Sequence, residues 1–517
     1  MARLAAAVVL GVVALLPFAA AAADPSRLYA QHCAACQGPD RLGLMGPALL
    51  PENLERLKKP EAAKVIREGR TATQMEGFAA KMTAEEIQSV VDWVYTPVTP
   101  RPVWTEEQIC ASRLVPVKPG DLKDSPTFVA DMMNLFIVVE AGDNHVSVFD
   151  GDKLERIHRF PSRYALHGGP KFTPDGRYVF FASRDGWVSK FDIWNLKTVA
   201  EIRAGINTRN VAVSSDGKYV AVANYLPHTL VLLDADLNLL KAIETRALQG
   251  EATSRVSAVY DAAPRRSFVA AMKDIPEIWE ISYDPKAEPI YEGYVHDYKM
   301  REGLAKPAFL NPRRTGLDDV LDDFFFDQSY ANVIGTSRQA GKGQVVNLNV
   351  RRKVADLDLP GMPHLGSGIT WEYQGRTVMA TPNLKEGLVS VIDMKDWKTI
   401  KQIPTLGPGF FMRSHENSRY AWVDSMMSPQ NKNVLQVIDK QTLDKAGEVR
   451  VEPGKTLAHI EFDRYGKYAL ASLWENEGAI IVYDAATLKE VKRIPARKPV
   501  GKYNLYNKIT RSSGTSH

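Results

Sequence analysis

The stretches PDGRYVFFA (residues 174–182) and SDGKYVAVA (residues 215–223) each carry a turn followed directly by a strand pattern, and DRYGKYALA (residues 463–471) repeats it near the C-terminus. Short hydrophobic runs between them end on Asp or Asn at a spacing in the low forties. These ends are Asp150, Asp192, Asp234, Asp284, Asn347, Asp393, Asp439 and Asp484. Two strand signals per unit of this length are typical of a β-propeller blade. The repeats therefore predict eight blades over residues 126–517.

One repeat is longer than the others. The interval from Asp284 to Asn347 is 63 residues and contains GYVHDYKMREGLAKPAFLNPRR (residues 293–314), which lacks strand alternation. Repeat folds tolerate extra chain in the loops at one face. We therefore expect a loop insertion of about twenty residues here, either over a site or on plain surface.

The first 23 residues have the layout of a secretory signal. Arg3 precedes an apolar run from Leu4 to Phe18, and five alanines follow at 19–23. A retained membrane anchor is the alternative, because the run approaches the roughly 20 residues that span a bilayer. Export into the periplasm is the favoured interpretation. The net charge of +4 without Lys or Arg runs gives a nucleic-acid partner no support.

Residues 24–96 are predicted to be helical. Ser26 is a candidate N-cap for a first helix, and Thr83 with Glu86 forms a capping-box pattern before the last one. The proline-rich run TPVTPRPVW (residues 96–104) opens a linker expected to cover 97–125. Of the three cysteines, Cys110 is expected to be a buried thiol without function.

The first helix ends in QHCAACQ (residues 31–37), which has the cysteine spacing of a c-type haem attachment site. Cys33 and Cys36 are the candidate attachment thiols, the loop GLMGPAL (residues 43–49) suits packing against a haem, and Met75 is the candidate second axial ligand. Gln37 stands where the ligand histidine is expected, and an amide is a poor iron ligand. Residues 24–96 resemble a class I cytochrome c whose covalent haem is compromised by Gln37. The alternative is a helical domain without haem.

In a propeller, loops that enter the innermost strands open onto one end of the central channel. Alignment of the repeats places His167 and Arg209 on such loops, with His459 near the equivalent position in the last repeat and His364 slightly before its own strand. Imidazole ligates iron and guanidinium holds carboxylates, so this set suits a metal macrocycle. For each histidine alone, a hydrogen-bonded structural role is the alternative.

Residues 176–214, GRYVFFASRDGWVSKFDIWNLKTVAEIRAGINTRNVAVS, resemble the haem d1 propeller of the cytochrome cd1 nitrite reductase family. The resemblance implies a small all-α cytochrome c domain followed by an all-β eight-bladed propeller that binds haem d1 or dihydro-haem d1 non-covalently. It implies that His167 is the proximal iron ligand and that Arg184 and Arg209 face the carboxylates of the ring.

The resemblance fails where a reductase protonates nitrite. The matching stretches, AAMKDIPEIWEI (residues 270–281) and DDFFFDQSYANVIG (residues 322–335), carry no histidine, so nitrite reduction is not expected. The chain is more similar to the dehydrogenase branch of the family, which oxidises a propionate of dihydro-haem d1 to acrylate and passes electrons toward the c haem. This resemblance implies that His364 is the distal ligand and that His459 and Tyr503 stand beside the propionate.

The same resemblance implies a monomer that transiently contacts nitrite reductase and other proteins of haem d1 biosynthesis. Two further interpretations stay open: a carrier that delivers haem d1 without chemistry, and a propeller scaffold that binds no chromophore.

Overall fold

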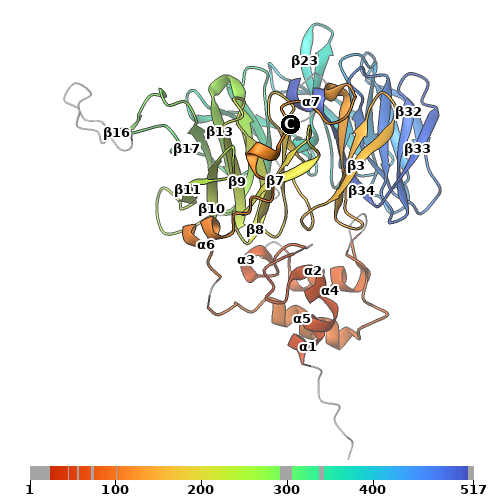
Figure 1. Cartoon of the computed structure of the whole chain (residues 1–517). Coiled ribbons are helices and arrows are strands. Elements are labelled where there is room, and N and C mark those ends of the chain that lie inside the picture. The colour runs from red at the N-terminus through yellow and green to blue at the C-terminus, as the bar shows by residue number, and fades with distance from the viewer. Residues whose placement is uncertain are drawn as a thin grey trace, which may run out of the picture.

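The computed structural model describes residues 24–44, 46–54, 57–70, 75–100, 102–291, 305–336 and 343–510. A small helical part is followed by a ring of sheets (Figure 1). The expected signal, residues 1–23, and residues 292–304 of the expected insertion lie outside the described residues. In the described ranges the longest helix has only eleven residues, and none has the length and hydropathy that a membrane span requires.

Eight four-stranded antiparallel sheets form the ring, which confirms the propeller that the repeat predicted. Blades 1 to 4, each given from the innermost to the outermost strand, are β34 (Pro499–Asn504), β1 (Leu135–Glu140), β2 (His145–Asp150), β3 (Glu155–Pro161); β4 (Lys171–Phe172), β5 (Tyr178–Ala182), β6 (Trp187–Asp192), β7 (Lys197–Arg203); β8 (Asn207–Val213), β9 (Tyr219–Leu226), β10 (Thr229–Asp234), β11 (Leu239–Glu244); and β12 (Val256–Ala262), β13 (Ser267–Met272), β14 (Glu277–Ser282), β17 (Pro312–Gly316).

Blades 5 to 8, in the same order, are β18 (Asp323–Phe326), β19 (Asn332–Thr336), β20 (Gly343–Asn347), β21 (Arg352–Leu357); β22 (Ile369–Tyr373), β23 (Arg376–Pro382), β24 (Leu388–Asp393), β25 (Thr399–Pro404); β26 (Met412–Arg413), β27 (Tyr420–Asp424), β28 (Val434–Asp439), β29 (Lys445–Arg450); and β30 (Leu457–Phe462), β31 (Tyr468–Leu473), β32 (Gly478–Asp484), β33 (Glu490–Ala496). The insertion leaves blade 4 between β14 and β17 as the pair β15 (Ile290–Tyr291) and β16 (Ala305–Lys306).

The repeated turn has a local physical cause. In blade 2 the Asp175 carboxylate accepts hydrogen bonds from the Thr173 hydroxyl at 2.5 Å and from the Arg177 N–H at 3.1 Å. Gly176 adopts φ +70°, a conformation that glycine reaches without a Cβ clash. Gly217 and Gly466 repeat this φ in blades 3 and 8. The turn motif therefore marks the innermost hairpin of each of these blades.

The aspartates at the ends of the third strands close the next hairpin. Asp192 accepts the N–H of Asn195 at 3.0 Å, and Asp393 accepts the N–H groups of Lys395 and Asp396 at 2.8 and 3.1 Å. These bonds satisfy backbone donors in the turn before each outermost strand, as short polar side chains do in Asx turns. The core lies between neighbouring sheets and is built from the buried strand residues.

The ring closes with the last strand of the chain. β34 pairs antiparallel with β1, with Ile137 opposite Tyr503, and so becomes the innermost strand of blade 1. The C-terminal helix α7 (Leu505–Thr510) follows directly and packs Leu505 into the core of that blade. Closure therefore carries Tyr503, which lies far along the sequence, onto the wall of the central channel.

The helical part contains α1 (Pro25–His32), α2 (Ala34–Gln37), α3 (Pro51–Leu54), α4 (Lys59–Glu68) and α5 (Ala84–Val94). Thr83 and Glu86 form the predicted capping box at the start of α5. Asp24, rather than Ser26, caps α1, because its carboxylate accepts the Ser26 N–H. The sequence reasoning also missed α4, whose buried face consists only of alanines.

The segment between the two parts lies against the propeller. It contains α6 (Glu106–Ala111), which buries Ile109 between blades 2 and 3, and the indole of Trp104 donates to the Arg203 carbonyl at 2.8 Å. Cys110 is exposed, so the expectation of a buried thiol was wrong. It lies on the solvent face of α6, because Ile109 takes the buried one.

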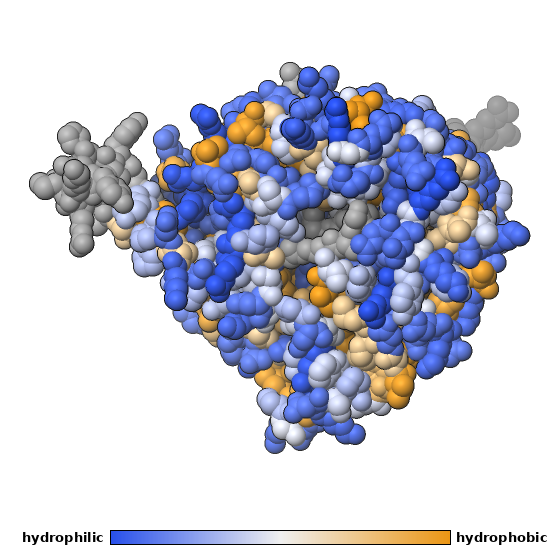
Figure 2. Space-filling view, turned by 90° about the horizontal axis from the view of Figure 1, so that it is seen from above, coloured by the Kyte–Doolittle hydropathy of each residue, from blue (hydrophilic) through white to orange (hydrophobic). Residues whose placement is uncertain are grey.

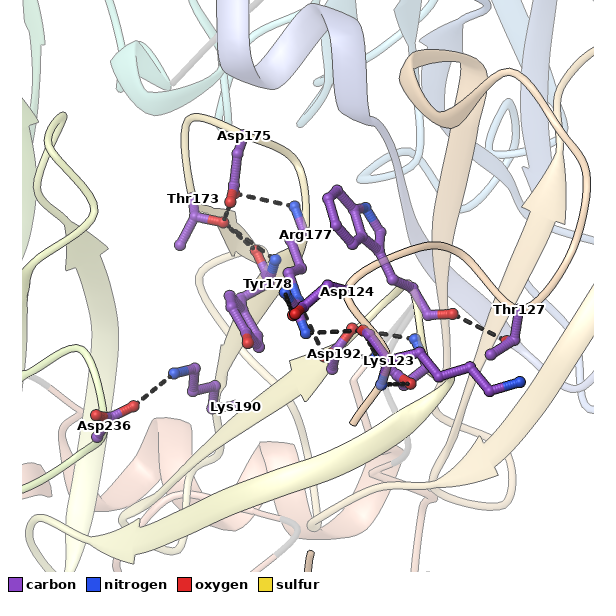
Figure 3. A network of polar contacts seen from close by, with 12 residues as sticks. Lys123, Asp124, Thr127, Thr173, Asp175, Arg177, Tyr178, Lys190, Asp192 and Asp236 are labelled. Atoms are coloured by element: carbon purple, nitrogen blue, oxygen red, sulfur yellow. Dashed lines mark hydrogen bonds and ion pairs between the residues drawn. The ribbon is translucent and has the colours of Figure 1, made fainter. Parts of the chain in front are cut away.

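Further along, the segment is fixed to blade 2. The guanidinium of Arg177 donates to the Lys123 carbonyl at 3.0 Å and pairs with Asp124 and Asp192 at 3.2 Å each (Figure 3). Asn195 also holds Lys123 through two hydrogen bonds. The helical part itself packs Ala48 and Leu50 against Ile206 and Leu226 of blade 3, below the ring in Figure 1.

Candidate functional site

The end of the ring away from the helical part is hollowed at its centre (Figure 2). Several side chains on the two inner strands of blades 1 to 6 and the loops next to them keep part of their surface accessible although protein surrounds them on every side. These are His167, Arg184, Arg209, Tyr225, Tyr260, His364 and Tyr503. A partly open side chain at such depth faces an internal space, so these residues line the central channel.

His167 lies on the loop before β4, as the repeat alignment predicted. Its Nδ1 lies 2.8 Å from the Arg209 carbonyl oxygen, and the Arg209 Nη1 lies 2.7 Å from Nδ1 and 3.1 Å from Nε2. Donation of the Nδ1 proton to that carbonyl leaves the lone pair on Nε2, where the Arg209 guanidinium is the neighbour in this structure. Burial, together with Arg184 and Arg209, lowers the pKa of His167 well below its usual range. A neutral imidazole is the form that ligates iron.

The backbone beside His167 must approach blade 3 closely. Gly168 has φ +82°, and a Cβ there would lie 2.4 Å from the Cβ of Asn210. The Asn210 side chain in turn bonds Val259 of blade 4 at 2.8 Å. The loop that presents His167 is therefore packed against blade 3, which is itself bonded to blade 4 at this point.

Buried cations lie on the blade 2 to blade 4 side of the channel. Arg184 has a pKa lowered to about 10 by burial and by the neighbouring Arg209. Burial by itself raises the pKa of Tyr225, but Lys273, Arg209 and Arg184 outweigh it and bring that pKa to about 8. Crowded buried cations favour an anionic ligand. This wall therefore suits a macrocycle that carries several carboxylates.

The positions where a nitrite reductase is expected to carry its proton donors hold ion pairs instead. Lys273 contacts Asp322 at 2.8 Å, and the Arg255 guanidinium binds both carboxylate oxygens of Asp274, with Nε to Oδ2 at 2.8 Å. A paired lysine is a poor acid at neutral pH. Lys273 and Asp274 are therefore both engaged in ion pairs.

His459 lies on the opposite side of the channel, in a β-bulge of β30 where the pairing with β31 shifts register. Its φ is +50°, which a non-glycine residue rarely adopts. Both ring nitrogens are buried without a hydrogen-bond partner. Burial, then Lys502 and Arg413, lower its pKa well below the usual range, so it is neutral at pH 7. Strain and an unpaired imidazole are common features of a functional site.

Tyr503 lies between His459 and the loop that carries His167. Its ring centroid lies 5.1 Å from that of His459, and a Cβ on Gly169, two residues after His167, would lie 3.1 Å from its ring. Burial raises the pKa of Tyr503 to about 12, so the phenol keeps its proton. The structure thus brings His167, Tyr503 and His459, from three blades, into one neighbourhood.

His364 precedes β22 and completes the ring of groups. Its Nδ1 lies 2.7 Å from the carbonyl oxygen of Phe410, and the two rings lie 4.0 Å apart. Phe411 follows and places its ring 4.6 Å from His459. The predicted histidines are therefore linked through two aromatic residues that the sequence reasoning missed.

The helical part contains the predicted thiol pair. Cys33 is half-buried beside α1, Cys36 is exposed on α2, and burial raises the pKa of Cys33 to about 11. The Gln37 side chain lies against the loop 43–49: a Cβ on Gly46 would lie 2.4 Å from its Nε2, and its Oε1 is buried without a partner. Met75 packs on the helical core. The thiols suit covalent attachment, but residue 37 offers an amide and no imidazole.

The residues of the propeller fit a tetrapyrrole better than a bare metal ion. Within the described ranges, no group of three or more His, Cys, Asp or Glu is arranged to hold a metal. The channel instead offers single imidazoles, buried cations and orphaned polar atoms, among them the Nε of Arg413. One axial ligand with guanidinium partners is what an iron ring with carboxylate side chains needs.

These features define a class of protein, an eight-bladed propeller whose channel carries single imidazoles and buried cations and which is joined to a helical part with a c-type thiol pair. Residues 130–508 match the family described as "Cytochrome D1 heme domain", and the chain belongs to this family. Residues 20–94 match "Cytochrome C oxidase, cbb3-type, subunit III". The family and the fold class expected from the sequence are confirmed.

Among curated proteins, the chain is 52% identical over 491 residues to the dihydro-heme d1 dehydrogenase of Pseudomonas aeruginosa, covering 95% of both chains. It is 26% identical to a nitrite reductase of Stutzerimonas stutzeri, covering 93% of this chain and 92% of that one. A solved structure, "Dihydro-heme d1 dehydrogenase NirN in complex with DHE", shares 52% identity with a TM-score of 0.79 and covers 94% of this chain and all of that one.

Proposed function

We propose that this chain is a dihydro-haem d1 dehydrogenase of haem d1 biosynthesis, which binds the tetrapyrrole in the propeller and oxidises one propionate to acrylate. The observation that carries the proposal is His459, a buried neutral imidazole with two unpartnered nitrogens beside Tyr503. The similarity to NirN in complex with DHE along 94% of the chain supports the substrate. Export to the periplasm, with residues 1–23 as a cleaved signal, is part of the proposal.

In this proposal His167 ligates the iron from one face and His364 from the other. Arg184 and Arg209 hold ring carboxylates in charge-assisted hydrogen bonds. The substrate supplies the conjugated iron ring through which electrons leave. The protein positions the ring, excludes water and accepts a proton at His459.

The reaction converts CH₂–CH₂–COO⁻ into CH=CH–COO⁻ with release of two protons and two electrons. His459 takes one proton as general base, because its lowered pKa keeps it unprotonated at neutral pH. Tyr503, whose pKa is raised, stays protonated and orients the side chain by hydrogen bonding. The oxidant is a ferric haem-protein acceptor, reduced in two one-electron steps.

Gln37 favours a second function, a carrier that binds haem d1 and hands it to nitrite reductase. An electron route through the helical part needs an iron ligand that this residue does not supply, so covalent haem on Cys33 and Cys36 would transfer electrons poorly. Transient contact with nitrite reductase and with other d1 biosynthesis proteins belongs to either function, and we propose a monomer for both.

Anaerobic incubation with dihydro-haem d1 and a diffusible one-electron acceptor separates the functions. A dehydrogenase changes the absorption spectrum from that of the precursor to that of haem d1. A carrier binds the tetrapyrrole and leaves the precursor spectrum unchanged. A scaffold takes up no chromophore, and that outcome would refute both proposals.

A further inference from the structure

Asp424, at the end of β27, is a fully buried carboxylate that holds the loop before β26. Its Oδ1 accepts the N–H of Phe410 at 2.7 Å, and its Oδ2 accepts the N–H of Phe411 at 3.1 Å. In the part of the chain that the structure describes, no cation forms an ion pair with it. Backbone N–H groups therefore provide the main compensation for burying this charge.

The hydrogen bond from the Phe410 N–H connects Asp424 with His364. Phe410 donates its N–H to Asp424 and accepts the Nδ1 proton of His364 on its carbonyl oxygen, 2.7 Å away. That acceptor selects the tautomer in which Nε2 of His364 is free. Asp424 thus acts on the His364 ring through a single residue.

The hydrogen bond from the Phe411 N–H connects Asp424 with His459. Phe411, held by Asp424, places its ring 4.6 Å from the imidazole. The backbone N–H of His459 also stabilises the ionised Asp424 carboxylate. On the other side, the Nζ of Lys502 donates to the His459 carbonyl and, at 2.9 Å, to the Ser472 hydroxyl. The Asp424 carboxylate and the Lys502 amine therefore both contact the backbone of His459.

Close packing keeps this connection short. A Cβ on Gly409 would lie 2.3 Å from the backbone oxygen of Asp424, so only glycine permits this approach. The Gly409 N–H donates to the Asn383 carbonyl at 2.9 Å, and Asn383 also bonds the Met362 N–H in the His364 loop at 3.1 Å. These contacts connect the loop that carries Phe410 to the end of β27 and, through Asn383, to the His364 loop.

We propose that Asp424 is a positioning residue that sets the orientations of His364 and His459 together. The inference rests on the proposed function for its catalytic consequence, but its geometric content concerns this chain alone. Asp424 touches neither the substrate nor the reacting atoms. It acts by holding the backbone on which the distal ligand and the base depend.

The test compares Asp424→Asn with Asp393→Asn. Asp393 serves as the control, because it is also a buried carboxylate at a strand end that accepts two backbone N–H groups. It differs from Asp424 in that it also pairs with Arg376 at 3.0 Å, and it lies in the outer hairpin of blade 6. The asparagine variant of Asp424 presents an NH₂ group to a backbone donor and must lose one of these bonds. We expect the oxidation rate constant to fall about 10- to 100-fold, as for a lost hydrogen bond to a charged group.

A second measurement does not need turnover. In the ligand-free protein with ¹⁵N-labelled histidine, we expect the Asp424→Asn substitution to shift the ring signals of His364 and His459 and Asp393→Asn to leave them unchanged. If wild type performs no oxidation, the proposed function fails, but the NMR comparison still decides the positioning role.

A folded Asp424→Asn protein with both ring signals in place and a rate within threefold of wild type would overturn the proposal. If that variant does not fold, Gly409→Ala moves the same loop and leaves the carboxylate intact. It should then reproduce the shifted His364 signal, and an unshifted signal would likewise overturn the proposal.

Discussion

Replacement of His459 by alanine should abolish catalysis while leaving the binding of the tetrapyrrole nearly intact. A positioned general base contributes about 10²- to 10⁴-fold to a rate, which corresponds to roughly 3–5 kcal/mol of transition-state stabilisation. Binding depends on other residues, since His167 and Arg209 lie on blades 2 and 3 and His459 on blade 8. We therefore expect His459→Ala to lower the oxidation rate constant about 1000-fold and to change the Kd less than threefold.

The stability effect should be small, because truncation removes two unpartnered buried nitrogens while it leaves a cavity. His415→Ala is the matched control: His415 is also fully buried, and its carbonyl also accepts a buried lysine, Lys440, at 2.9 Å. It lies in the β26–β27 turn, away from the channel groups. Single-turnover absorption after anaerobic mixing measures the rate, and equilibrium titration measures the Kd. A rate loss below tenfold for His459→Ala, or an equal loss for His415→Ala, would refute the assignment.

Three further outcomes are expected. Gln37→His should create a low-spin c-type haem spectrum in protein matured with haem, and it should speed steady-state oxidation with an acceptor that enters only through the c haem; wild-type turnover as fast as the variant's would contradict this. Arg209→Ala should weaken tetrapyrrole binding about 10- to 100-fold in equilibrium titration, the loss of roughly 1.5–3 kcal/mol for a hydrogen bond to a charged group. Because the folded-state pKa of His459 is lowered, only the unfolded chain gains its proton below about pH 6.5. Stability from this group is thus complete above that pH and is lost progressively as the pH falls. Denaturant unfolding of His459→Gln should show a smaller loss between pH 7.5 and 5.5 than wild type, and equal losses would refute the linkage.

The fold could be predicted because its signals are local and repeated. A turn such as that around Gly176 needs a positive φ and a capping carboxylate wherever it occurs, so the same letters return in each blade that uses it. The aspartates after the third strands return for the same reason. In the helical part, α4 escaped notice because its two fully buried residues, Ala62 and Ala63, are small and weakly hydrophobic.

The site was predictable only to the extent that the repeats could be aligned. His167 and Arg209 were found because they precede or enter innermost strands in register. Arg413 lies on the innermost strand of blade 7, and a stricter alignment of inner strands contained that signal. The sequence carried no such signal for Asp424 and Phe410, because their importance depends on which loops contact each other across two blades.

Ring closure separates the residues of the channel from those of the N-terminal helical part. The final strand β34 closes the ring and also contains Tyr503 and Lys502. A protein that binds the tetrapyrrole correctly must therefore have formed the closed ring. Gln37 lies outside that ring, in a part that touches blade 3 through Ala48 and Leu50. In the proposed function, the amide at residue 37 weakens the electron route through the helical part without disturbing the imidazoles of the channel. Binding and electron exit can therefore fail independently, and the Gln37→His variant should change only the second.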